Sequence, residues 1–188
     1  MVASREEMIR QMRQPSLWQR LGVLDWAWAA LVVAATAGTY IVLGDVMNGY
    51  EVVITTFTAA TMIGLGWHWP ASRGYMIAVC GLSLFAISRY PDLAAAEADF
   101  FLKYLLSSQS AIMWMSALFP AATLAYGAAL FTGNDFMGRL GSRFTWLAAG
   151  AGLIGLLVRW HETHLYEGGI GYIPVSNLYE VFVLFGVI

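Results

Sequence analysis

The sequence predicts an all-α, polytopic helical membrane protein, and three observations support this fold class. Hydrophobic residues make up 59% of the chain and charged residues only 12%, about half the charged share of a soluble domain. The apolar residues gather in long unbroken runs without period-2 alternation, which excludes a β-barrel. A water-soluble fold of this size could not bury so much apolar surface. We therefore predict one membrane domain, residues 1–188, with five full transmembrane helices plus a truncated sixth.

The elements begin with a polar segment, residues 1–23, that carries Glu6 and Glu7 and lacks the features of a cleavable signal peptide. The first apolar run is therefore predicted to be a signal anchor. Each of the five runs holds roughly 16–23 mostly apolar residues, near the ~20 that cross a ~30 Å hydrocarbon core. The predicted spans cover about 24–43, 51–69, 74–90, 109–131 and 145–160.

Three local features refine the middle of the chain. Residues 92–106 are alanine-rich and end in an aromatic cluster, which predicts a helix at the membrane interface leading into the fourth span. Pro120 is predicted to kink that span, because proline removes a backbone hydrogen bond. In the fifth span, small residues recur at helical spacing and favour close packing of a neighbouring helix; these are Ala148, Ala151, Gly152 and Gly155.

The last element follows a predicted outer loop, residues 161–177. Asn177 and Glu180 have the spacing of a capping box that starts a helix. The partial span 178–188 would be about 16 Å long, roughly half a bilayer. We expect the chain to be a truncated form of a longer protein.

The basic residues predict the topology. Seven of the ten Lys and Arg residues fall on one side, in the N-terminal segment and in alternate loops: Arg5, Arg10, Arg13, Arg20, Arg73, Arg139 and Arg143. The outer loop 161–177 faces the opposite side. The net charge of −2 gives no reason to expect nucleic-acid binding.

Two histidines of the outer region are the strongest candidate ligands. His161 and His164 stand three residues apart, so they share one face if the helix continues. They could ligate a metal or haem, or they could be solvated residues at the membrane surface. A zinc site would need Glu162 or Glu167 as well. The third histidine, His68, is interpreted as an interfacial residue between two tryptophans.

Arg159 and Trp160 close the fifth span. The arginine could extend to the lipid headgroups, or it could pair with a carboxylate such as a haem propionate. Glu180 lies a few residues into the last apolar run, where a charge is costly unless it is paired. Its capping role is the simplest explanation.

Arg159-Trp160, followed by Ile173-Pro174-Val175-Ser176-Asn177-Leu178-Tyr179-Glu180-Val181-Phe182, resembles a motif of the CcsA/CcsB (ResC-type) system II cytochrome c biogenesis proteins. In that family, an Arg-Trp and a short external loop precede Gly-His-x-Pro-x-Ser-Asn-x-Tyr-Glu at the start of the next helix. The stretch 102–114 is similar to the version found in some proteobacteria. The matched motif residues are Pro174, Ser176, Asn177, Tyr179 and Glu180.

The resemblance implies a function. Members of this family carry haem b to the outer membrane face and attach it to apocytochrome c as a haem lyase, together with a second, ResB-type membrane subunit. The implied site would contain Arg159, Trp160, His161 or His164, and Tyr172. The chain differs from the family in two ways. Tyr172 replaces a histidine that ligates haem, and residues 1–188 have no counterpart of the family's tryptophan-rich haem segment.

Two other classes of function compete with haem handling. A non-catalytic membrane scaffold, or an assembly subunit acting with a partner, needs no haem ligand. A transporter of small solutes would need polar residues at mid-membrane or broken helices in paired repeats, and Pro120 alone does not satisfy that requirement.

Overall fold

The computed structural model describes residues 17–45, 47–166 and 177–187. Every regular element within these ranges is helical, in agreement with the predicted all-α class. The chain forms two compact units, Met1–Arg73 and Gly74–Ile188.

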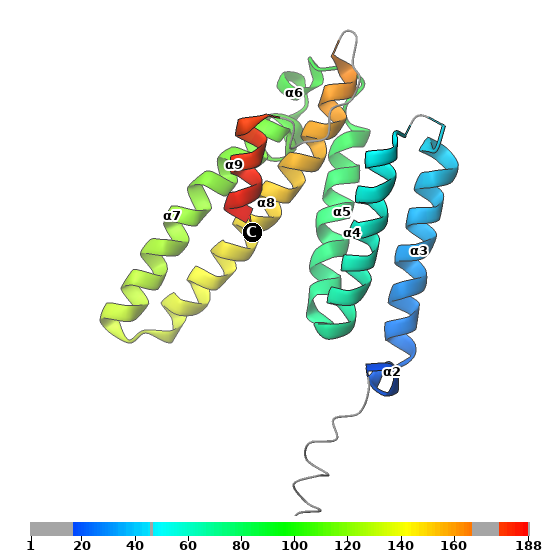
Figure 1. Ribbon diagram of the computed structural model, residues 1–188. Helices are drawn as coiled ribbons and strands as arrows, with labels where there is room; N and C mark the ends of the chain where they lie inside the picture. The colour runs from blue at the N-terminus through cyan, green and yellow to red at the C-terminus, as the bar shows by residue number, and fades with distance from the viewer. Residues whose placement is uncertain (1–16, 46, 167–176, 188) are drawn as a thin grey trace, which may run out of the picture. The chain divides into compact units, whose positions relative to one another are not determined.

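The first unit contains a helical hairpin. Its elements are α2 (Leu17–Arg20), α3 (Val23–Leu43) and α4 (Gly49–His68), and α3 and α4 run antiparallel (Figure 1). Asn48 and Glu51 form a capping box at the start of α4, with Asn48 N donating to Glu51 Oε2 over 2.8 Å. Trp28 Nε1 donates to the Met62 carbonyl over 3.0 Å and so joins the two helices.

The second unit is built around α7 and α8. These two helices run antiparallel, and α9 lies along α8 (Figure 1). Gly133, with φ of +67°, ends α7 in the left-handed region. The elements are α5 (Ala71–Ser88, whose first turn belongs to the first unit), α6 (Ala95–Ala98), the π-helix η1 (Leu102–Leu106), α7 (Ser108–Thr132), α8 (Asp135–Leu165) and α9 (Leu178–Val187).

The small residues of α8 mark its contacts with its neighbours, as the sequence predicts. A Cβ at Gly155 would lie 2.7 Å from Ile112 Cγ1 and 3.2 Å from the Ser108 carbonyl oxygen, both on α7. A Cβ at Gly152 would meet Met115 of α7 and Val187 of α9. Ala148 is fully buried. Close packing of α7, α8 and α9 therefore depends on these positions.

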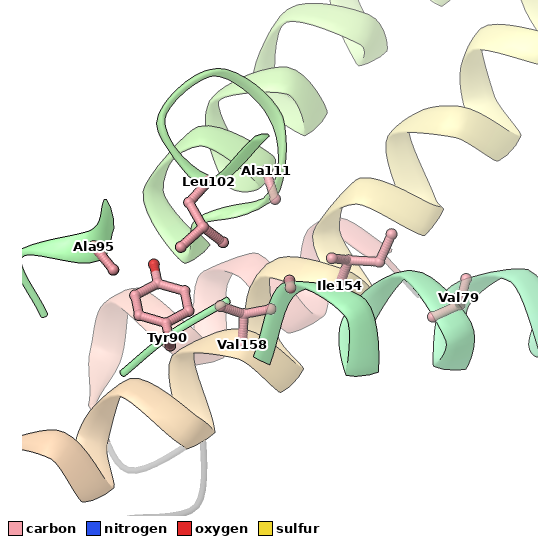
Figure 2. Packing of buried hydrophobic residues seen from close by; sticks show 8 residues of the cluster. Val79, Tyr90, Ala95, Leu102, Ala111, Ile154 and Val158 are labelled. Atoms are coloured by element: carbon pink, nitrogen blue, oxygen red, sulfur yellow. The ribbon is translucent and has the colours of Figure 1, made fainter. Parts of the chain in front are cut away.

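A buried cluster joins the segment around α6 and η1 to the long helices. It draws on α5, α7 and α8 as well, and Figure 2 shows Tyr90, Leu102 and Val158 close together within it. Its buried members are Val79, Ala86, Tyr90, Ala95, Leu102, Ala111, Ile154 and Val158. This core fixes the ends of α5, α7 and α8 relative to one another.

Four helices among the described residues are long and apolar enough to cross a membrane: α3, α5, α7 and α8. The predicted number of full spans was five, and α4, which corresponds to the predicted span 51–69, is not among the four. The apolar helix α9 has 10 residues. The membrane class is thus supported, while the fifth span stays a prediction.

The boundaries of α8 and of the interfacial helix differ from the predicted ones, and α8 already begins at Asp135, whereas the fifth span was predicted to begin at 145. Helix α8 has 31 residues and continues to Leu165, so 161–165 is helical although the predicted outer loop began at 161. Its length of about 46 Å exceeds a hydrocarbon core of ~30 Å, so it would extend into the interface. The expected interfacial helix 92–106 is divided into α6 and η1. Pro120 lies within α7, which runs through it as one helix.

Candidate functional site at the end of helix α8

Four helix ends bring polar side chains together in the second unit. We call this group the carboxylate cluster. Tyr90 follows the end of α5, Ser108 begins α7, Arg159 and Glu162 lie in the last turns of α8, and Glu180 lies in the first turn of α9. Both glutamates are buried, with 6% of Glu162 and 1% of Glu180 exposed. Buried carboxylates in an apolar protein mark candidate functional sites.

Glu162 is the centre of the hydrogen bonds. Its Oε1 accepts from the Tyr90 hydroxyl over 2.6 Å and from the Ser108 backbone N over 3.2 Å. Its Oε2 accepts from Ser108 Oγ over 2.5 Å. One carboxylate therefore joins α8 to the end of α5 and the beginning of α7. These three donors offset the cost of burying the charge.

The Arg159 guanidinium lies between two carboxylates. Its NH1 is 3.5 Å from Glu162 Oε2, and its Nε is 3.6 Å from Glu180 Oε1. NH1 also donates to the Tyr166 hydroxyl over 3.3 Å. With two carboxylates facing one guanidinium, the cluster has a formal charge of −1. An additional anion beside Arg159, such as a propionate, would be repelled by both glutamates.

Glu180 has two functions at the start of α9. Its backbone N donates to Asn177 Oδ1 over 2.9 Å, which is one of the two hydrogen bonds of the predicted capping box. Its carboxylate also faces Arg159 of α8. The motif residue Glu180 thus links α9 to α8 in addition to its part in helix capping.

Tyr90 is positioned to remain protonated. Burial and the hydrogen bond to the Glu162 carboxylate both raise the pKa of its hydroxyl above the usual value of about 10. The hydroxyl is therefore a donor to Glu162 throughout the physiological pH range.

The two histidines share one side of the last turns of α8, as their spacing predicts for a continuing helix. His164 is exposed, and its Nδ1 lies 2.9 Å from the Trp160 carbonyl oxygen. Because a carbonyl only accepts, Nδ1 carries the hydrogen and Nε2 of the neutral ring has a free lone pair. This arrangement is typical of histidines that bind metal.

His161 is partly buried, with its ring 6.2 Å from that of Tyr90. Among the described residues, its Nε2 and the Nε1 of Trp160 are buried without a hydrogen-bond partner. Such orphaned atoms often indicate an unfilled binding requirement. No group of three or more His, Cys, Asp or Glu in the described part of the chain could hold a metal ion.

The remaining predicted site residues are only partly described. Tyr172, Pro174 and Ser176 lie outside the described residues, as does Glu167. Tyr179 is exposed on α9. Of the described candidates, Arg159 and Glu180 face each other, and Trp160, His161 and His164 lie in the same last turns of α8 as Arg159.

Sequence reasoning did not identify Tyr90, Ser108 and Glu162 as one site. Glu162 was considered only as an outer-loop acid or an added zinc ligand. Its spacing of three from Arg159 would have indicated a pair on a helix that continued past residue 160. Tyr90 and Ser108 lie 72 and 54 residues from Glu162 and carried no signal of their own.

Comparison of the chain with protein-family models, curated proteins and solved structures finds no match.

Proposed function

We propose that this protein handles haem b on the outer face of a bacterial inner membrane during cytochrome c assembly, as the CcsA/CcsB resemblance implies. Its proposed topology has a cytoplasmic N-terminus, α4 as a fifth span and α9 as part of a sixth. Its partners would be apocytochrome c and a ResB-type subunit. The four apolar helices and the motif ending in Tyr179-Glu180 support this proposal.

The observation that carries the proposal is the orientation of His164. Its Nδ1 is held by the Trp160 carbonyl, and Nε2 of this exposed residue has a free lone pair. The chemistry of these donors fits an axial ligand for haem iron. His161, with its orphaned Nε2, is the second candidate ligand. Arg159 is engaged by two carboxylates, so the fit depends on the histidines.

The chain would act by positioning. Bound haem supplies the vinyl groups to which cysteine thiols of apocytochrome c add. The protein's own residues hold the ligand in place: Glu162 fixes the last turn of α8 against Tyr90 and Ser108, and that turn carries both histidines. Rigid placement of a reactive group is an established source of rate acceleration.

The test is the absorption spectrum of the detergent-purified protein reduced with dithionite. We expect a b-type spectrum that is lost in His164→Ala and retained in His68→Ala. His68 is a matched control, since its Nδ1 lies 2.8 Å from the Gly64 carbonyl oxygen in the same local geometry. Loss in His161→Ala alone would move the ligand but support the function. Absence of haem from the unaltered protein, or its retention in both outer-histidine variants, would refute the proposal.

The alternative is a membrane scaffold that works with a partner. The cluster favours it in one respect, because Tyr90, Ser108 and Arg159 together satisfy the Glu162 carboxylate without any ligand. A stable, haem-free protein that copurifies with a membrane subunit would support this alternative.

A further inference from the structure

Five large apolar side chains are exposed around η1. They form what we call the aromatic patch: Phe100, Phe101, Tyr104, Leu105 and Trp114. Phe100 is 64% exposed, and its ring centroid lies 5.7 Å from that of Phe101 and 5.2 Å from that of Tyr104. Exposing apolar surface to water costs about 25 cal/mol per Å². The patch therefore calls for an apolar surrounding.

The patch has a firmly held backbone. Leu102, which is fully buried, packs into the core beside Val158 (Figure 2). Trp114 Nε1 donates to the Tyr104 carbonyl over 2.8 Å, and Ser110 Oγ donates to the Lys103 carbonyl over 2.6 Å. The exposed rings are therefore presented by a segment that is tied to α7 and to the core.

Paired charges border the patch. Arg89 is 3.4 Å from Asp99, and its guanidinium carbon lies 5.2 Å from the centre of the Phe85 ring. Lys103 is 3.8 Å from Glu97. Each cation thus has its own acid, so these four groups are neutral together.

We propose that the aromatic patch is seated in the boundary between headgroups and acyl chains of one membrane leaflet, with phospholipid as its partner. The inference depends on the proposed membrane topology, because the segment joins α5 to α7. Aromatic rings beside long cationic side chains are typical of this boundary. The patch also reaches both helices, because the exposed Phe85 of α5 lies 5.6 Å from Phe101 between ring centroids and Trp114 of the patch belongs to α7.

The paired charges that border the patch indicate which kind of lipid it needs. Because Arg89 and Lys103 are already paired, seating is driven by apolar contact and does not require anionic lipid. Ser108 begins α7 just after the segment and bonds to Glu162. Seating therefore holds the carboxylate cluster near the headgroups, where the outer aqueous phase can reach His164.

The experiment uses nitroxide labels on single cysteines in a Cys80→Ser background. The labelled variants are Phe100→Cys and Tyr104→Cys, in phosphatidylcholine vesicles with and without phosphatidylglycerol. Glu97→Cys is the water-side control, with a side chain 84% exposed beside Lys103. Leu124→Cys is the lipid control on α7. Collisions with oxygen and with a water-soluble nickel chelate are measured at each label.

We expect labels at 100 and 104 to favour oxygen, as at 124, and label 97 to favour the nickel chelate. Phosphatidylglycerol should change neither result. Nickel access at 100 and 104 equal to that at 97 would overturn the inference, as would spin–spin broadening at 100 from a second copy. A need for phosphatidylglycerol would also overturn it. Nickel access at 124 would instead refute the membrane topology itself.

Discussion

The two units each contain an arginine bound to acidic side chains at helix ends, but the two arginines are bound differently. In the first unit, Arg73 donates through Nε and NH2 to the Gly66 carbonyl over 3.0 and 2.7 Å and forms an ion pair with Asp25. In the second unit, Arg159 faces two glutamates at 3.5 and 3.6 Å.

The difference indicates that Arg73 has a structural role, whereas Arg159 belongs to a candidate functional site. Arg73 has one carboxylate and nearby carbonyls, so charge and hydrogen bonds are balanced within α3, α4 and the start of α5. Arg159 is outnumbered by its carboxylates, and the adjacent Trp160 and His161 have orphaned nitrogens among the described residues. A site with unused donors and an unbalanced charge can serve a ligand.

The largest loss of stability is expected when Glu162, the centre of the carboxylate cluster in the second unit, is replaced. Glu162→Ala leaves Tyr90 and Ser108 without their acceptor, and removing one partner of a buried charged group costs about 3–5 kcal/mol. Denaturant unfolding in detergent, followed by circular dichroism, measures the free energy. Glu97→Ala, on an exposed side chain, should stay within about 0.5 kcal/mol. A loss below about 1 kcal/mol at Glu162, typical of an exposed pair, would contradict the central role of this residue.

The second effect isolates one hydrogen bond of the cluster. Tyr90→Phe should destabilise the protein by about 1.5–3 kcal/mol, because it removes a neutral donor to a buried carboxylate.

The difference in stability between the unaltered protein and Tyr90→Phe should depend on pH. The folded pKa of Tyr90 is raised, so the stability that this hydroxyl contributes is fully present below about pH 10 and is lost as the pH rises through the folded value. The thermal unfolding midpoints of the unaltered protein and of Tyr90→Phe should therefore converge above pH 10. A difference between the two midpoints that stayed constant would contradict the hydrogen bond from Tyr90 to Glu162.

The third prediction concerns glycines that allow close helix contacts in each of the two units. A Cβ at Gly66 would overlap the Trp28 indole, and a Cβ at Gly155 would crowd Ile112 and the Ser108 carbonyl. Each Gly→Ala change should cost about 1–3 kcal/mol through overpacking. Gly127→Ala is the control, since a Cβ there meets nothing within 4 Å. Equal stability of all three variants would show that the helices can separate without cost.

The smallest expected effect is the difference in melting temperature between the lysine variants of Arg73 and Arg159. Lysine cannot reproduce the planar set of donors that holds Arg73 on the Gly66 carbonyl and Asp25. Arg73→Lys should therefore melt about 2–4 °C below Arg159→Lys, whose ion pairs are longer. Differential scanning fluorimetry in detergent measures this difference. The reverse order of the two melting temperatures would contradict the distinction between a structural Arg73 and a candidate-site Arg159.

The membrane class and several residues of the candidate site could be predicted from the sequence. The membrane class follows from the length and composition of apolar runs, which are local properties. Arg159, His161, His164 and Glu180 could be selected because charged or ligating residues are unusual beside such runs. The sharing of one helix face by the histidines followed from their spacing alone.

The contacts that these residues make depend on how the helices pack. The outer loop was predicted to begin at His161, whereas α8 continues to Leu165. Which donors reach Glu162 depends on the meeting of the ends of α5 and α7, far away in the sequence. Likewise, whether Arg159 is free for a ligand depends on Glu180 of another helix. Partner choice among buried polar groups is set by helix packing, which residue type and spacing do not encode.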